Sequence, residues 1–144
     1  MLIGQIIASK GAAVVTAPLD ATIADIVKVL KEKRIGAIVI SSGEDQIAGI
    51  ISERDITRGL ADHGSALLGK KVSDMMTSEV VTCGPDDGVE KLMQEMTSGR
   101  FRHMPVVQNG RLMGIISIGD VVKHRLQELE TEAHMLQDYI AGGA

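Results

Sequence analysis

The sequence predicts an α+β fold built from two similar β-α-β-β-α units. The first observation is an internal repeat, because residues 80–122 align with residues 14–57 at an offset of about 66 with ten identities. The second is that short β-branched runs alternate with helical patterns in each copy. The third is that 44% of the 144 residues are hydrophobic, which is enough for a core. Since each copy would be marginally stable alone, we expect the two copies to pack on each other.

Each copy begins with a short apolar segment and a strand. Residues 2–8 precede the first copy, and residues 70–74 occupy the matching place before the second. The first strands are expected at residues 14–16 and 80–82, and each is followed by a proline and an aspartate that favour a turn.

The next element of each copy is an amphipathic helix. Thr22 and Asp25 form the sequence pattern of a capping box at the start of the first one. Apolar residues at relative positions 0, 3, 4 and 7 then define one helix face. They are Ile23, Ile26, Val27 and Leu30 in copy one and Val89, Leu92, Met93 and Met96 in copy two. We interpret these residues as core.

A hairpin follows each of these helices. The first strands of the hairpins are expected at residues 35–40 and 101–107, and the returning strands at residues 47–51 and 112–116. Residues 42–45 and 108–110 supply the turns. Asn109-Gly110 is the stronger turn signal because both residues tolerate positive φ.

Both copies end in the same strand-to-helix corner. The first reads Gly-Ile-Ile-Ser-x-x-Asp over residues 49–55, and the second repeats it over residues 114–120. A helix is expected to begin at Ser52 in copy one and at Ser117 in copy two, because Ser followed three residues later by an acidic residue is a capping pattern.

The second of these helices is predicted to continue to about residue 140 as an extended C-terminal helix. Its apolar residues alternate at steps of three and four, and they are Leu126, Leu129, Ala133, Leu136 and Ile140. Two heptads are too few for a self-standing coiled coil. We favour packing of this stripe against the rest of the chain, with a contact between subunits as the alternative.

The composition argues against several classes of function. The net charge of −4, the isoelectric point near 5.5 and the near absence of aromatic residues argue against nucleic-acid binding. There is no signal-peptide pattern and no apolar run long enough to cross a membrane, so we expect a cytoplasmic protein. The four histidines lack zinc-ligand spacing, and Cys83 has no histidine partner in any motif. We therefore expect no metal site and no enzymatic activity.

The doubled corner is the remaining candidate for chemistry. A lone Ser-x-x-Asp is most simply a helix cap. Two such corners at equivalent places, each after a buried strand and near basic residues, favour a binding role. A carboxylate there can accept hydrogen bonds from ribose hydroxyls, and the Ser hydroxyl and free N–H groups can meet phosphate. Candidate phosphate contacts, each equally well explained as a surface charge, are Arg54, Arg58, Arg102, His103 and Lys123.

Together these features resemble a tandem pair of CBS domains, known as a Bateman module, over nearly the whole chain. The resemblance rests on the two β-α-β-β-α units, on residues 36–40 and 102–107 as middle strands, and on the two corners. It implies two pseudo-symmetric repeats that meet through their sheets, with two clefts that bind AMP, ADP, ATP or NAD, or in some members S-adenosylmethionine. It also implies a homodimer.

The resemblance further implies that each cleft is shared by the two copies. The Asp would hold the ribose, and apolar strand residues would surround the adenine. One cleft would be formed by Thr16, Ile38, Arg102, His103, Ser117 and Asp120. The other would be formed by Ser52, Arg54, Asp55, Thr82 and Met104. Arg58, Pro105 and Lys123 complete the expected nucleotide-binding set.

The two corners are not identical, so the clefts need not share a ligand. Copy two has Gly119 where copy one has Arg54, and copy one has Gly36-Ala37 where copy two has Arg102-His103. We expect a regulatory adenine-nucleotide sensor that acts on an unknown protein by conformational or oligomeric change. The alternative is a non-binding assembly protein that acts through dimerisation. The expected boundaries are 1–68 for repeat one, 69–125 for repeat two and 126–144 for the C-terminal extension.

Overall fold

The computed structural model describes residues 1–11 and 13–142. Copy one contains β1 (Thr16–Pro18), α2 (Ile23–Lys33), β2 (Ala37–Gly43), β3 (Gln46–Ser52) and α3 (Glu53–His63). Its three strands form one sheet in the order β1-β2-β3, with β1 parallel and β3 antiparallel to β2. The linker to copy two holds the 3₁₀ helix η1 (Gly64–Gly69) and α4 (Val72–Met75).

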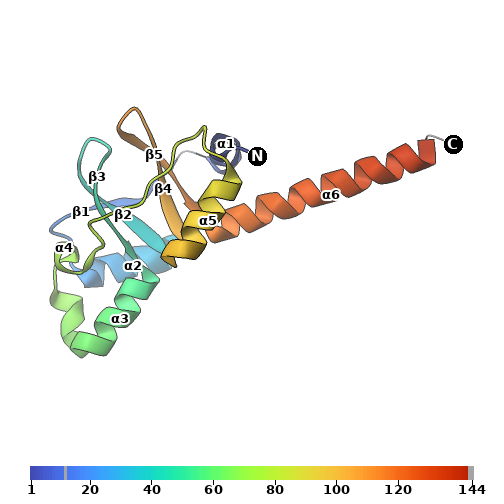
Figure 1. The fold of residues 1–144 in the computed structure, drawn as a ribbon. Coiled ribbons are helices and arrows are strands. Elements are labelled where there is room, and N and C mark those ends of the chain that lie inside the picture. Colours follow the sequence, from blue (N-terminus) through green and yellow to red (C-terminus); the bar gives the residue numbers. More distant parts are fainter. Residues whose placement is uncertain (12, 143–144) are drawn as a thin grey trace.

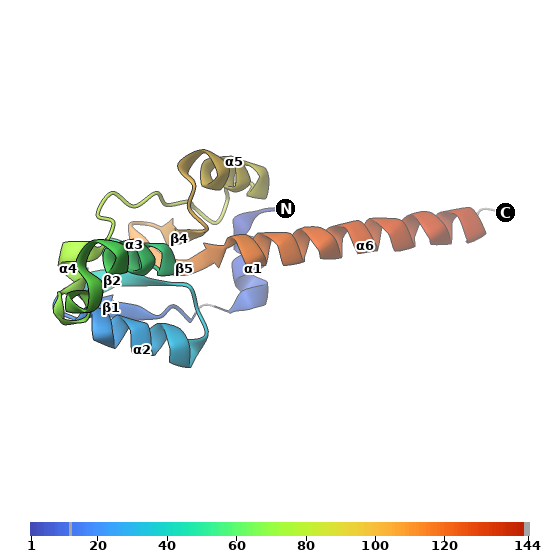
Figure 2. The ribbon, with the colours of Figure 1, turned by 90° about the horizontal axis from the view of Figure 1, so that it is seen from below.

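Copy two contains α5 (Val89–Gly99), β4 (His103–Gln108), β5 (Arg111–Ser117) and α6 (Ile118–Gly142). Figure 2 shows α2 and α5 on opposite outer sides of the body, with the strands between them. The α+β class, the two repeats and the long C-terminal helix are thus confirmed.

The expected strand at residues 80–82 is wrong. Only Cys83 pairs with the sheet of copy two, through a single parallel bridge to Val106. Beyond it the chain turns at once, because the Gly84 N–H donates to Asp87 Oδ2 at 2.8 Å. Val81 is 45% exposed, so residues 80–82 run outside the sheet. In copy one the strand exists but begins at Thr16 rather than at residue 14.

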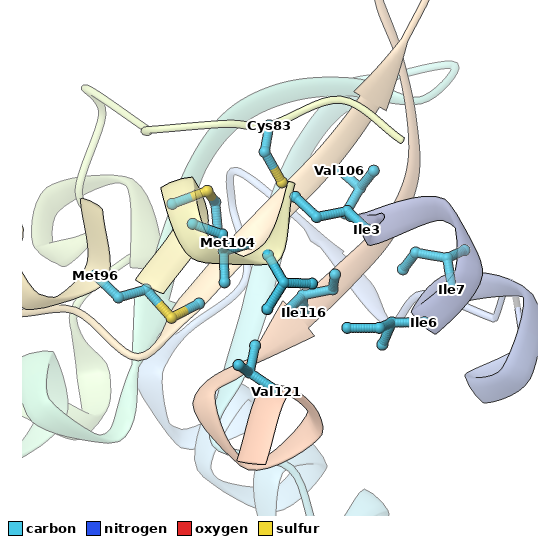
Figure 3. Close-up of a cluster of buried hydrophobic side chains, with 11 residues drawn as sticks. Ile3, Ile6, Ile7, Cys83, Met96, Met104, Val106, Ile116 and Val121 are labelled. Atoms are coloured by element: carbon cyan, nitrogen blue, oxygen red, sulfur yellow. The ribbon is translucent and has the colours of Figure 1, made fainter. Parts of the chain in front are cut away.

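The short segments that precede the two copies are exchanged between them. Helix α1 (Ile3–Lys10) precedes copy one, yet its buried isoleucines pack into the core of copy two. Figure 3 shows Ile3, Ile6 and Ile7 on one side of the cluster that contains Ile116, Val106 and Met104. Conversely, α4 precedes copy two, and its buried valine, Val72, belongs to the core of copy one.

Backbone hydrogen bonds fix this exchange on both sides. The Gly4 N–H donates to the Pro85 carbonyl at 2.8 Å, and the Val72 N–H donates to the Ala21 carbonyl at 2.8 Å. Each core is therefore completed by the segment that leads into the other copy, which explains why two units of marginal size form one body.

The capping box at the start of α2 is confirmed. The Asp25 N–H donates to Thr22 Oγ1, and the Thr22 N–H donates to Asp25 Oδ2, both at 3.2 Å. The apolar stripe is narrower than predicted, since Val27 and Met93 are 37% and 38% exposed while the other members are buried.

Both hairpin turns form where the sequence predicts them. Glu44 and Asp45 have φ values of 36° and 62°, and Asn109 and Gly110 have 53° and 76°. Positive φ at both central residues matches the twist of the flanking strands.

Helix α6 departs from the favoured interpretation of its apolar stripe. Its first turns are anchored by the buried Val121 and His124, and the rest of the helix extends away from the body (Figures 1 and 2). Leu126, Leu136 and Ile140 are 55%, 60% and 67% exposed. Packing of the stripe against the rest of the chain is therefore wrong, because the body ends before the stripe does. Among the described residues, no helix has both the length and the apolar character needed to cross a membrane.

Candidate functional site

A cavity of about 850 Å³ lies where the two copies meet. Four segments enclose it: the N-terminus of α3, the N-terminus of α6, the loop between α5 and β4, and the linker at residues 77–81. Its volume lies within the range of small-molecule sites. Residues 52–55 of the copy-one corner and residues 117–119 of the copy-two corner therefore line one space, whereas Asp120 does not.

Asp55 lies at the copy-one corner and is partly buried. Its Oδ2 accepts from the Ser52 N–H at 2.8 Å and from the Ser52 hydroxyl at 3.1 Å. Within the part of the chain that the structure describes, Oδ1 has no hydrogen-bond partner. The carboxylate is thus oriented by the cap and still presents one oxygen as an acceptor.

Arginines dominate the charge around this carboxylate. Arg54 and Arg58 lie one turn apart on α3, and Arg100 and Arg102 come from the loop before β4. The Arg54 guanidinium donates to the Arg100 carbonyl, which joins the two copies across the cavity. The acidic lining residues, Glu53, Asp55 and Glu79, are fewer than the arginines. With two helix N-termini added, the cavity favours an anion.

His103 is a partly buried wall of the cavity that packs on the backbone of Gly36. A Cβ built on Gly36 would lie 3.0 Å from His103 Cε1 and 3.3 Å from Glu53 Oε1. Burial lowers the pKa of His103 below its usual value; the nearby Glu53 carboxylate opposes this, while the Lys10 ammonium reinforces it. Burial therefore favours the neutral form of the imidazole.

The copy-two corner is closed by a lysine. The Lys10 ammonium donates to Asp120 Oδ2 at 2.7 Å and to the Ile115 carbonyl at 2.8 Å. Asp120 Oδ2 also accepts from the Ser117 N–H at 2.9 Å. Burial alone would raise the pKa of Asp120, but the hydrogen bonds from Lys10 and Ser117 outweigh it and lower that pKa.

Among the residues that the structure describes, no lysine takes this place in copy one. There, the carbonyl of Ile50, which is equivalent to Ile115, accepts from the Thr77 N–H at 2.9 Å. The two carboxylates therefore differ: Asp55 is open to the cavity, and Asp120 is held in an ion pair.

The structure gathers members of both expected clefts in the single cavity. The lining residues from the predicted set are Ser52, Arg54, Asp55, Arg58, Arg102, His103 and Ser117. Thr16, Thr82 and Lys123 are exposed and do not line it. The side chains of Ile38 and Met104 are buried in the copy cores. Pro105 is also buried, outside these two clusters, and does not line the cavity.

Sequence reasoning missed three parts of this geometry: the linker at residues 77–81, Arg100 and the Lys10 ion pair. Arg100 had a signal, because it is identical to Arg34 at the repeat offset. Both residues adopt the left-handed conformation, with φ of 55°, just after their helices. Lys10 had none, since it lies outside the aligned repeat.

The described residues offer neither a metal site nor a reactive cysteine. Within 1–11 and 13–142, no cluster of three or more His, Cys, Asp or Glu side chains could hold a metal ion. Cys83 is buried, and burial, reinforced by Asp87 and Glu95, raises the pKa of its thiol to about 12. A thiol that stays protonated at neutral pH is a poor nucleophile.

Comparison with known proteins gives one consistent family. The model of the CBS domain matches residues 4–62 and 72–127. The mitochondrial CBS domain-containing protein CBSX3 of Arabidopsis thaliana is 41% identical over 128 residues, which are 86% of this chain and 62% of that protein. The chain therefore spans about three fifths of that relative. The location of this chain in the cytoplasm stays a prediction.

Two solved structures share the arrangement. A CBS-domain containing protein from Agrobacterium tumefaciens has a TM-score of 0.84 and 43% identity, covering 87% of this chain and 99% of that one. A CBS domain protein from Pyrobaculum aerophilum, solved in complex with AMP, has a TM-score of 0.76 and 27% identity, covering 91% of this chain and 99% of that one.

Proposed function

Since this chain belongs to the CBS-domain family, as a tandem pair of such domains, we propose that it is a regulatory module that binds an adenine nucleotide and has no catalytic step. The observation that carries the proposal is the meeting, in one cavity of about 850 Å³, of an oriented carboxylate at Asp55 with four arginines. A nucleotide combines the two groups that such a site recognises, a vicinal diol and an anionic phosphate.

The residues that line the cavity determine how we place the nucleotide in it. The ribose hydroxyls donate to Asp55 Oδ1, the oxygen that the cap does not use. The phosphates lie among Arg54, Arg58 and Arg102, with the two helix N-termini nearby. The adenine packs against the apolar part of the wall, formed by Ile50, Val80, Val81, Phe101 and Ile118.

The charge of the cavity selects among adenosine-containing ligands. AMP, ADP, ATP and NAD carry phosphate, which the arginines attract. S-adenosylmethionine carries a sulfonium cation in that place, which the same arginines repel. We therefore expect phosphate-bearing ligands to bind more tightly than S-adenosylmethionine.

Binding would signal by changing how the copies sit together. The cavity is walled by α3 of copy one and by α6 and the β4 loop of copy two. A ligand held by both copies stabilises the arrangement in which both sets of contacts form, and shifts the population toward it. The protein that reads this change is unidentified.

A second candidate function is assembly without ligand binding. The exposed apolar stripe of α6 favours it, because a monomer gains nothing from that exposure. The two functions are compatible, and ligand binding and mass can be measured independently.

The proposal is tested by titrating the full chain with AMP, ADP, ATP, NAD and S-adenosylmethionine in a calorimeter. We expect at least one phosphate-bearing adenine nucleotide to bind, to raise the melting temperature and to bind more tightly than S-adenosylmethionine. Absence of binding by all five would contradict the proposed function and leave assembly as the remaining candidate.

A further inference from the structure

The exposed stripe of α6 has the spacing of a coiled-coil seam. From Val122 to Ile140 the apolar residues follow one another at steps of four, three, four, three and four. Alternating steps of four and three are the a and d spacing of a heptad repeat, which is the pattern of a left-handed coiled coil. We call the following residues the α6 seam: Val122, Leu126, Leu129, Ala133, Leu136 and Ile140.

The α6 seam points away from the chain's own body. Val121 and His124, on the other side of the helix, are buried and hold α6 on the body, whereas Val122 is 50% exposed. In heptad terms, the body contacts the outer positions and leaves the a and d positions uncovered. Two copies could therefore join along their seams with the bodies on opposite sides of the helix pair.

The flanking charges distinguish a parallel pair from an antiparallel one. In a parallel, in-register pair, Arg125 at a g position faces Glu130 at the next e position of the other helix, and twofold symmetry makes this contact twice. Arg125 also bonds Glu128 of its own helix at 3.1 Å, and its guanidinium has donors for both.

The antiparallel pairing of the same seam places like charges together. With Leu126 opposite Leu136, Glu130 faces Glu130 of the other helix on one flank. Glu132 faces Glu132 on the other flank. Both contacts are repulsive, so charge complementarity selects the parallel pair.

We propose that α6 forms a parallel, in-register two-stranded coiled coil with α6 of a second copy of this chain. The inference does not depend on nucleotide binding. The seam extends over about 27 Å of helix, which is short for a coiled coil, so the dimer should dissociate on dilution.

The first experiment measures the mass of the full chain over a range of concentrations by analytical ultracentrifugation. Leu129→Glu places a charge at the centre of the seam, and we expect it to weaken the dimer at least about tenfold. Met135→Glu is the matched control, because Met135 is 67% exposed but lies off the seam. Both sites are exposed in the single chain, so both variants should fold, and circular dichroism at a concentration where the wild type is monomeric checks this.

The second experiment determines orientation by oxidation of Leu136→Cys. A parallel pair brings the two L136C thiols together, whereas an antiparallel pair separates them by about 15 Å along the axis, too far for a disulfide. The buried Cys83, with its raised pKa, does not compete.

The expected result is a concentration-dependent dimer that L129E disrupts, that M135E preserves and that L136C cross-links. A wild-type chain that is monomeric at every concentration would overturn the proposal, as would equal dimers in L129E and M135E. A dimer that is sensitive to L129E but gives no L136C disulfide would overturn the parallel arrangement.

Discussion

Replacing Asp55 with asparagine should weaken nucleotide binding without disturbing the fold. The side-chain amide of the D55N variant keeps an oxygen that can accept from the Ser52 N–H, so the start of α3 stays capped. What the variant loses is the negative charge and the second acceptor oxygen that we assign to the ribose.

The expected size follows from that loss. A hydrogen bond to a charged group contributes about 1.5–3 kcal/mol. The dissociation constant should therefore rise between about tenfold and a little over a hundredfold. Calorimetry on the full chain measures it, after thermal melts have established that the variant is folded.

The matched control is Asp120→Asn, the same chemical change at the equivalent corner. Sequence alone predicts equal effects at the two corners. The structure predicts otherwise, because Asp120 is bonded to Lys10 and does not line the cavity. We expect D120N to change the affinity by less than about twofold. Unchanged affinity in D55N, or an equal loss in D120N, would refute the assignment of the ribose to Asp55.

Three further predictions concern the Lys10–Asp120 ion pair and the cavity wall at Gly36 and His103. Lys10→Met removes the hydrogen bond and the positive charge that lower the pKa of Asp120, so that pKa should rise in an NMR titration; an unchanged pKa would show that Lys10 does not hold that carboxylate. Gly36→Ala should press on the His103 ring and destabilise the fold by about 1–3 kcal/mol in urea unfolding, and wild-type stability would count against the close packing. Because the folded-state pKa of His103 is lowered, mainly by burial, the folded chain resists its protonation, and stability should fall as pH drops below about 6.5. His103→Gln should reduce that fall between about pH 7.5 and pH 5.5, whereas an identical pH profile would exclude His103 as its source.

The elements that are determined locally could be predicted from sequence. The Thr22–Asp25 capping box and the Asn109-Gly110 turn depend on side chains a few residues apart, and both form as expected. The repeat then fixed how many such units the chain holds, because each corner recurs with the same Ser and Asp.

The features that depend on distant segments could not be predicted. A repeat alignment pairs α1 with copy one by position, yet its isoleucines complete the core of copy two. The Lys10–Asp120 ion pair joins residues 110 positions apart, and no periodicity reports such a contact. Residues 80–82 have β-branched character, yet only the next residue, Cys83, pairs with the sheet, through one bridge to Val106.

The candidate site was predictable in its chemistry and less so in its shape. The corner residues Ser52 and Asp55 line the cavity, as do the basic residues Arg54, Arg58 and Arg102. The apolar strand residues Ile38 and Met104 are buried in the cores instead, because strand alternation alone does not say which face a neighbouring helix covers. Whether these residues bind a nucleotide stays a prediction.

The most direct measurement is a crystal structure of the full chain grown with the tightest-binding adenine nucleotide. We predict density for one nucleotide in the cavity between the copies, with its ribose hydroxyls within hydrogen-bond distance of Asp55 Oδ1 and its phosphates beside Arg54 and Arg102. A nucleotide bound elsewhere, or a cavity filled by the protein's own side chains with Asp55 serving only as the cap of α3, would contradict it.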